Sequence, residues 1–126
     1  MKKLVLDTNI FLRFLLNDIP SQANQAEKIF QAAKFKKNKL LVPQIVIFEI
    51  IFALEKYYGF PKKEVLNKIK VILAMEFLSI ADKDVFTDAV GLYVQNNLSF
   101  PDSFLISFTK QQMADIFSFD KEMKNF

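Results

Sequence analysis

Four carboxylates stand out in this 126-residue sequence, because together they could hold divalent metal ions. They are Asp7, Glu49, Asp102 and Asp120. Mg²⁺ and Mn²⁺ prefer oxygen ligands, and they commonly bridge carboxylates to a substrate phosphate. One such ion lowers the pKa of a bound water, and a second stabilises the leaving oxygen in an in-line displacement. The residue types therefore predict metal-assisted hydrolysis of a phosphoester.

Glu49 carries most of this interpretation, since it interrupts the most apolar stretch of the chain, residues 45–54. In a helix its neighbours three and four positions away are Ile45, Val46, Phe52 and Ala53, and none is a cation. A carboxylate buried on such a face is costly unless a cation pairs with it. A distant lysine is one explanation. The one we prefer is a carboxylate that opens into a crevice while its helix is buried around it.

The other three acids each have a simpler local explanation. Asp7 could cap a helix, Asp102 could complete a capping box with Ser99, and Asp120 could cap a terminal turn. Clustered carboxylates, however, raise each other's pKa values unless a cation neutralises them, so the set of four favours a metal. The remaining acids that we considered have the character of surface or cap residues and are excluded: Glu55, Glu64, Glu76, Asp82 and Asp84.

Composition removes most other catalytic strategies. The chain has no cysteine and no histidine, which excludes thiolate metal sites, disulfides and the Ser-His-Asp and Cys-His arrangements. Only Gly59 and Gly91 are glycines, so neither a Walker loop nor a dinucleotide fingerprint can be written. Any catalysis must therefore rest on carboxylates and metal ions.

The elements that position these acids alternate between strands and helices. Short apolar runs predict four strands, at residues 4–6, 40–42, 77–80 and 116–119, and the segments between them have helical periodicity. Candidate helix starts are Asp7, Ser21, Pro43, Pro61, Asp82 and Ser99. This alternation predicts an α/β fold, a three-layer α/β/α sandwich around a mostly parallel sheet. Asp7 and Asp120 each directly follow a predicted strand, where such sheets place their binding crevice.

The chain is long enough for one domain, residues 1–126, with a substantial core. No stretch approaches the ~20 apolar residues of a membrane helix, so we expect no membrane segment and a cytoplasmic location. The net charge of +3 suits a polyanionic partner without requiring one. Lys34, Lys36, Lys37 and Lys39 form a basic connector, which we interpret as a solvated turn, with contact to an RNA backbone as the alternative.

The acids and their flanking residues resemble those of the PIN domain family, most closely its VapC-type toxin ribonucleases. The resemblance covers essentially the whole chain and rests on residues 6–9 around Asp7, the lone Glu49 in its apolar helix, Asp102 in residues 100–103, and Asp120 after residues 117–119. It implies an α/β/α sandwich and a Mg²⁺- or Mn²⁺-dependent nuclease that cleaves single-stranded RNA. It also implies a small antitoxin partner and a homodimer.

Carried over by position, Asp7, Glu49, Asp102 and Asp120 would be the metal ligands. Thr8, Asn9, Ser118 and Arg13 match supporting residues of the family's site. Two features depart from the family: Pro101 directly precedes Asp102, and six residues follow Asp120 where relatives usually continue into a fifth strand. We therefore expect a sheet of four strands, or five if that strand is present.

Three functions compete at this point. The first is a metal-dependent endoribonuclease. The second is a non-catalytic module that binds RNA or protein on the same fold. The third is an aspartyl-phosphate phosphatase or receiver-like domain with Asp7 as nucleophile, although such phosphatases carry a second aspartate two residues later, where this chain has Asn9.

Overall fold

The computed structural model describes residues 1–126, and they form two compact units, residues 1–81 and residues 82–126. Each unit is described by itself. The single domain expected over residues 1–126 stays a prediction.

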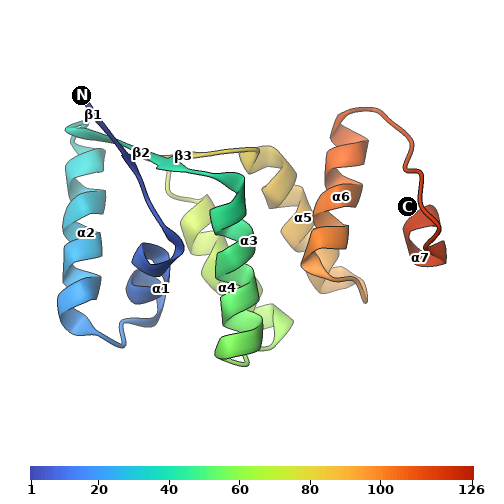
Figure 1. Cartoon of the computed structure of the whole chain (residues 1–126), viewed down its shortest axis with the longest axis horizontal. Helices are drawn as coiled ribbons and strands as arrows, with labels where there is room; N and C mark the ends of the chain where they lie inside the picture. The colour runs from blue at the N-terminus through green and yellow to red at the C-terminus, as the bar shows by residue number, and fades with distance from the viewer. The chain divides into compact units, whose positions relative to one another are not determined.

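The first unit is built on a parallel sheet of three strands in the order β1-β2-β3. These are β1 (Lys2–Val5), β2 (Asn38–Val42) and β3 (Leu78–Ile80). Leu4 pairs with Leu40 and Leu40 with Leu78, so these three leucines form one row across the sheet. The helices of this unit lie on one side of the sheet (Figure 1).

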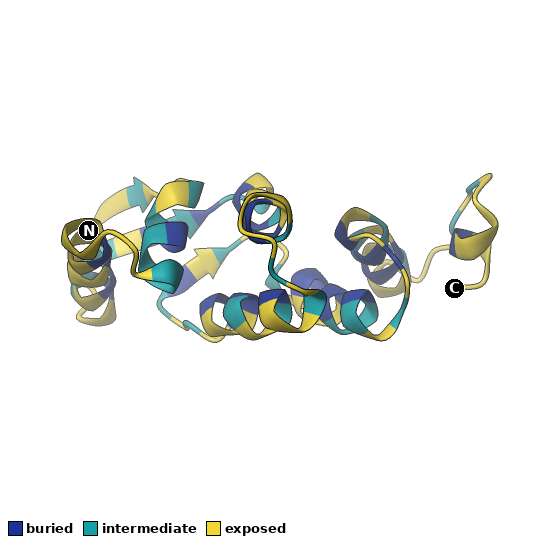
Figure 2. Ribbon diagram, turned by 90° about the horizontal axis from the view of Figure 1, so that it is seen from below, coloured by how far each residue is buried: buried dark blue, intermediate teal, exposed yellow.

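Burial differs between the two faces of the sheet because side chains alternate along each strand. Leu40, Val42 and Leu78 are buried, whereas Val5, on the opposite face, is 67% exposed. In the helices, the residues on the outer faces are coloured as exposed and those on the inner faces as buried (Figure 2). The core of the first unit therefore lies between the leucine row and the helices.

Two helical connections link the strands. The first contains α1 (Thr8–Leu16) and α2 (Pro20–Lys34), and the second contains α3 (Gln44–Phe52), η1 (Ala53–Tyr57) and α4 (Lys62–Leu73). Phe30 of α2 packs against α1 and against the residue before β3, since its ring lies 5.9 Å from Phe11, 5.0 Å from Phe14 and 5.7 Å from Phe77, measured between ring centroids. Such aromatic contacts add to the stabilisation from apolar burial.

Most of the expected helix starts in this unit are confirmed. Asp7 is the N-cap of α1, and Pro43 and Pro61 directly precede α3 and α4. The prediction that Ser21 caps α2 is wrong. Pro20 is already the first helical residue and Ile19 is the N-cap, because the fixed φ of proline suits that position.

The helix that carries Glu49 changes its hydrogen bonding after Phe52. Its continuation, η1, is a π-helix, in which the Tyr58 N–H donates to the carbonyl of Ala53 at 3.1 Å, five residues earlier. The apolar pattern of residues 45–58 predicts a helix to about Tyr58, which is confirmed, but gives no sign of the π-turn. Gly59 ends the segment with a positive φ of 67°.

The second unit consists of α5 (Lys83–Gln95), α6 (Phe100–Gln111) and α7 (Lys121–Lys124). Helices α5 and α6 pack together, and the buried Ser107 hydroxyl donates to the carbonyl of Val85 at 2.8 Å. The Phe86 and Phe100 rings stack with their centroids 6.0 Å apart. A second cluster joins α7 and the segment before it to α6. Its members are Leu98, Ile106 and Met123, with Leu92 and Ile116 packed against them.

The predicted fourth strand is not present. Residues 114–119 form neither a strand nor a helix, and Phe117 and Phe119 are 89% and 91% exposed. A strand needs a neighbouring strand for its backbone hydrogen bonds, and all the regular elements of the second unit are helices. The sheet therefore has three strands instead of the expected four or five.

The α/β class with a parallel sheet is confirmed. The first unit supplies that sheet and one layer of helices. None of the helices combines the length and apolar character needed to cross a membrane.

Candidate metal centre

Asp7 lies two residues after the end of β1 and is the N-cap of α1, at the carboxyl end of the strand as the sequence predicts. Its Oδ1 accepts a hydrogen bond from the Ile10 N–H at 3.4 Å, which is the expected capping interaction. Its other carboxylate oxygen accepts no hydrogen bond, and the residue is exposed. A carboxylate has about four lone-pair sites, so the cap leaves Asp7 free to bind a cation.

Glu49 lies in the middle of α3 and is exposed. The neighbouring Val46 and Ala53 are buried, while Ile45 and Phe52 are 60% and 58% exposed. Glu49 therefore lies on the accessible face of a helix whose other face belongs to the core. Its position agrees with the expectation that its carboxylate is not in the core.

Asp102 and Asp120 both lie at helix N-termini in the second unit. Asp102 is in the first turn of α6, where its N–H donates to the Ser99 hydroxyl at 3.2 Å. Asp120 is the N-cap of α7, and its Oδ1 accepts from the Glu122 N–H at 2.9 Å. The positive end of a helix stabilises a carboxylate at each position. Ser99 therefore caps α6 as expected, but only one of the two hydrogen bonds of a capping box is present, the one from the Asp102 N–H to the Ser99 hydroxyl.

None of the four carboxylates pairs with a lysine or arginine. Their chemistry fits Mg²⁺ or Mn²⁺, which take carboxylate oxygens as ligands. Two of them, Asp7 and Glu49, belong to the first unit, and Asp102 and Asp120 belong to the second. Neither unit by itself brings three or more acidic side chains together around a metal position. The joint site stays a prediction.

The smaller predicted residues lie beside the acids. Thr8 and Asn9 are the first two residues of α1, with Thr8 half-buried and Asn9 exposed. The Ser118 hydroxyl accepts a hydrogen bond from the backbone N–H of Asp120 at 3.0 Å. Ser118 therefore orients the backbone that presents the Asp120 carboxylate.

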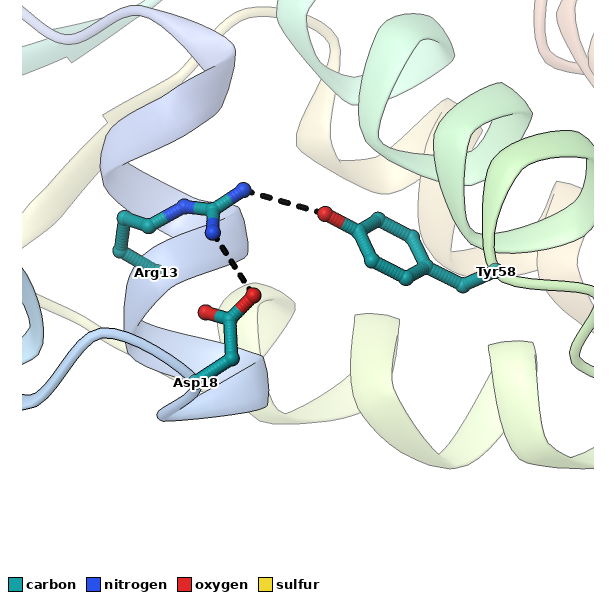
Figure 3. Close-up of polar contacts among 3 residues, drawn as sticks. All are labelled: Arg13, Asp18 and Tyr58. Atoms are coloured by element: carbon teal, nitrogen blue, oxygen red, sulfur yellow. Dashed lines mark hydrogen bonds and ion pairs between the residues drawn. The ribbon is translucent and has the colours of Figure 1, made fainter.

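Arg13 has partners that the sequence did not indicate (Figure 3). Its guanidinium donates to Asp18 Oδ2 at 2.7 Å and to the Tyr58 hydroxyl at 3.0 Å. The hydrogen bond to Tyr58 is the largest cause that holds the pKa of Arg13 above its ordinary value, and the neighbouring Asp18 adds a smaller contribution in the same direction. Arg13 thus ties the end of α1 to the residue that follows η1. Tyr58 is 45 positions away, so no local pattern could reveal the contact.

Two comparisons bear on these positions. The model of the family described as "PIN domain" matches residues 4–126. A "VapC ribonuclease" from Aquifex aeolicus (strain VF5) is 26% identical over 121 residues, which cover 95% of this chain and 89% of that protein.

Proposed function

This chain belongs to the PIN domain family, and on that premise we propose that it is a divalent-metal-dependent endoribonuclease that cleaves single-stranded RNA. The similar protein named a VapC ribonuclease supports a ribonuclease of the toxin type. The observation that carries the proposal is that four carboxylates at the family's motif positions have no cationic partner within the protein.

We assign Asp7, Glu49, Asp102 and Asp120 as the residues that would hold Mg²⁺ or Mn²⁺. A bound ion supplies a water of lowered pKa and positive charge for the developing negative charge of the phosphate. The chain's own contribution is to fix these carboxylates. Capping hydrogen bonds orient Asp7 and Asp120, and the N-terminal turn of α6 fixes the backbone of Asp102. Hydrolysis of the phosphodiester by such a water would leave a 5′-phosphate on one product and a 3′-hydroxyl on the other.

The first test compares cleavage of a labelled single-stranded RNA by the wild type, Asp7→Asn and Glu49→Gln in Mn²⁺. We expect each variant to lose at least about 100-fold in rate, because even residues that only orient metal ligands contribute about 10- to 100-fold. Glu64→Gln and Asp84→Asn are matched controls, since both acids are exposed in the first turn of a helix outside the proposed site. Both controls should keep wild-type rates.

Equal cleavage by the wild type and the two site variants, after identical purification, would reject the proposal and indicate a contaminating nuclease. RNA binding without any turnover at saturating Mn²⁺ would instead favour a non-catalytic RNA-binding module. A phosphoryl adduct on Asp7, detected by mass spectrometry after treatment with a small phosphodonor, would favour the aspartyl-phosphate alternative.

We also propose a small antitoxin partner, a homodimer and a cytoplasmic location, as the resemblance implies. Ile45 and Phe52, which flank Glu49 on α3, are exposed apolar side chains that a protein partner could cover. A partner that covers them would also block access to Glu49. Static light scattering of the purified chain tests the dimer, and co-purification with the product of an adjacent gene tests the antitoxin.

A further inference from the structure

Six exposed lysines gather at the amino ends of the first two strands. We call this group the lysine edge. It lies where the C-terminal end of α2 meets the starts of β1 and β2 (Figure 1). Because Asp7 follows the other end of β1, the lysine edge and Asp7 lie at opposite ends of the sheet. Its members are Lys2, Lys3, Lys34, Lys36, Lys37 and Lys39.

The pairing of the strands places two of these charges side by side. Lys3 of β1 is the register partner of Lys39 of β2. Neighbouring strands are about 4.8 Å apart, and like charges in directly opposite positions are destabilising. No lysine of the group pairs with a carboxylate, although the Lys34 ammonium lies 5.5 Å from the centre of the Phe77 ring. The repulsion is therefore not relieved within the protein.

The turn after α2 keeps a lysine where glycine is preferred. The Lys37 N–H donates to the carbonyl of Ala32 at 3.0 Å, and the Lys36 N–H donates to that of Ala33 at 2.9 Å. These two bonds define a Schellman motif, whose left-handed position is usually glycine. Here it is Lys36, with a φ of 60°. The chain thus places a positive charge at a strained position.

Phe35 adds an aromatic ring to the lysine edge. It lies between Lys34 and Lys36 in the sequence and is 74% exposed. Surfaces that bind single-stranded nucleic acid combine positive charge along the backbone with aromatic rings on which bases stack. Phe35 and its neighbouring lysines have both features.

Simpler explanations account for only part of this arrangement. Lysines in the last turn of α2 suit the negative end of the helix, and lysines on an edge strand prevent it from pairing with other chains. Neither effect requires Lys39, which lies on the central strand opposite Lys3. Neither effect explains why an exposed phenylalanine, Phe35, lies among these lysines.

We propose that the lysine edge binds the backbone of single-stranded RNA away from the scissile bond, with a base stacked on Phe35. The proposal rests on the ribonuclease function proposed above. It predicts that RNA long enough to reach both ends of the sheet binds more tightly than a short oligonucleotide that occupies only the cleavage site.

Binding should be measured with a labelled polyuridine in the Asp7→Asn background, so that no cleavage occurs. The test variant replaces Lys36, Lys37 and Lys39 with glutamine. The matched control replaces Lys28, Lys63 and Lys70, three exposed lysines elsewhere in the first unit, with the same loss of charge. We expect the test variant to bind more weakly. The slope of log affinity against log salt concentration should become less negative by about 2, since each lost phosphate contact contributes about 0.7. The control should change little.

Phe35→Leu separates stacking from charge. We expect about fivefold weaker binding or more, because stacking of a base on an aromatic ring is worth at least that much, with no change in the salt slope. Equal weakening by the test and control triple variants would overturn the proposal, since only net charge would then matter. Binding to anionic phospholipid vesicles in preference to polyuridine would also overturn it.

These outcomes are separable from the failure of the proposed function. If the wild type cleaves RNA but the lysine-edge variants bind polyuridine normally, only the lysine edge is rejected. If the wild type cleaves no RNA while the lysine-edge variants lose binding, the nuclease proposal fails and the RNA surface stands.

Discussion

Asp7 both caps a helix and is proposed to bind metal, and its two oxygens allow these roles to be separated. Asparagine is as good an N-cap as aspartate, whereas alanine is a poor one. In an Asp7→Asn variant, the side-chain carbonyl oxygen of the new amide can keep the bond to Ile10, while the negative charge is lost. Loss of activity and loss of stability therefore need not coincide at this residue.

We expect Asp7→Ala to lower the free energy of unfolding by about 1 kcal/mol, and Asp7→Asn to leave it nearly unchanged. Both should abolish RNA cleavage. Urea denaturation followed by circular dichroism, together with the cleavage assay, checks this. If Asp7→Asn were as unstable as Asp7→Ala, its loss of activity could not be assigned to the metal site.

Lys36 gives a second test at the scale of a residue. Lys36→Gly should raise the free energy of unfolding by up to about 1 kcal/mol, because glycine relieves the left-handed strain but loses more backbone entropy on folding. Lys37→Gly removes the same charge at a position without a positive φ and should be destabilising. Urea denaturation measures the free energy of unfolding of both variants. A higher value for Lys36→Gly than for the wild type, with a lower value for Lys37→Gly, would confirm the strain at Lys36.

At the scale of elements, the sequence predicts structure where the cause is local. Asp7, Pro43 and Pro61 fix the helices that they precede, and short apolar runs fix the three strands. Residues 116–119 have the same apolar character, but strand formation depends on a partner strand, which no local pattern supplies. The π-turn escapes prediction because it changes hydrogen bonds without changing which residues are apolar. Among the site residues, the flanking elements of Asp7, Glu49 and Asp102 were predictable, whereas the partners of Arg13 were not.

The packing of α5 on α6 makes a prediction for one hydrogen bond. Ser107→Ala removes the buried bond to the Val85 carbonyl and should lower the free energy of unfolding by about 1 kcal/mol. Thr109→Ala is the control, because the Thr109 hydroxyl donates to a carbonyl of its own helix, Leu105, at a more exposed position. Its effect should stay within about 0.5 kcal/mol. Chemical denaturation compares the two, and equal effects would argue against a special role for the bond between helices.

At the scale of the whole molecule, the proposed metal site draws two carboxylates from each unit. A ligand that binds only the folded protein stabilises it, by about 2.7 kcal/mol at a hundred times its dissociation constant. If the four acids hold metal together, Mn²⁺ should raise the unfolding temperature of the wild type. Asp7→Asn in the first unit and Asp102→Asn in the second should each abolish that rise.

The same experiment predicts the effect of metal removal. Chelation should abolish cleavage and return the unfolding temperature to its metal-free value, and added Mn²⁺ should restore both. Differential scanning fluorimetry with a parallel cleavage assay measures the two together. A normal Mn²⁺ shift in Asp102→Asn would show that the ion does not depend on the second unit and would contradict the four-residue site.

The π-turn of η1 also has a consequence for how the gene can change. A π-turn holds one residue more than the α-helix that would replace it, so deletion of a single residue within Ala53–Tyr57 should let a regular α-helix continue through the segment. Because the π-turn accommodates the extra residue as a local bulge, the residues after it would keep their positions around the helix axis, and Tyr58 would stay beside Arg13. In the lineage of this protein, the extra residue should therefore be able to be gained or lost while the tyrosine and the arginine both stay.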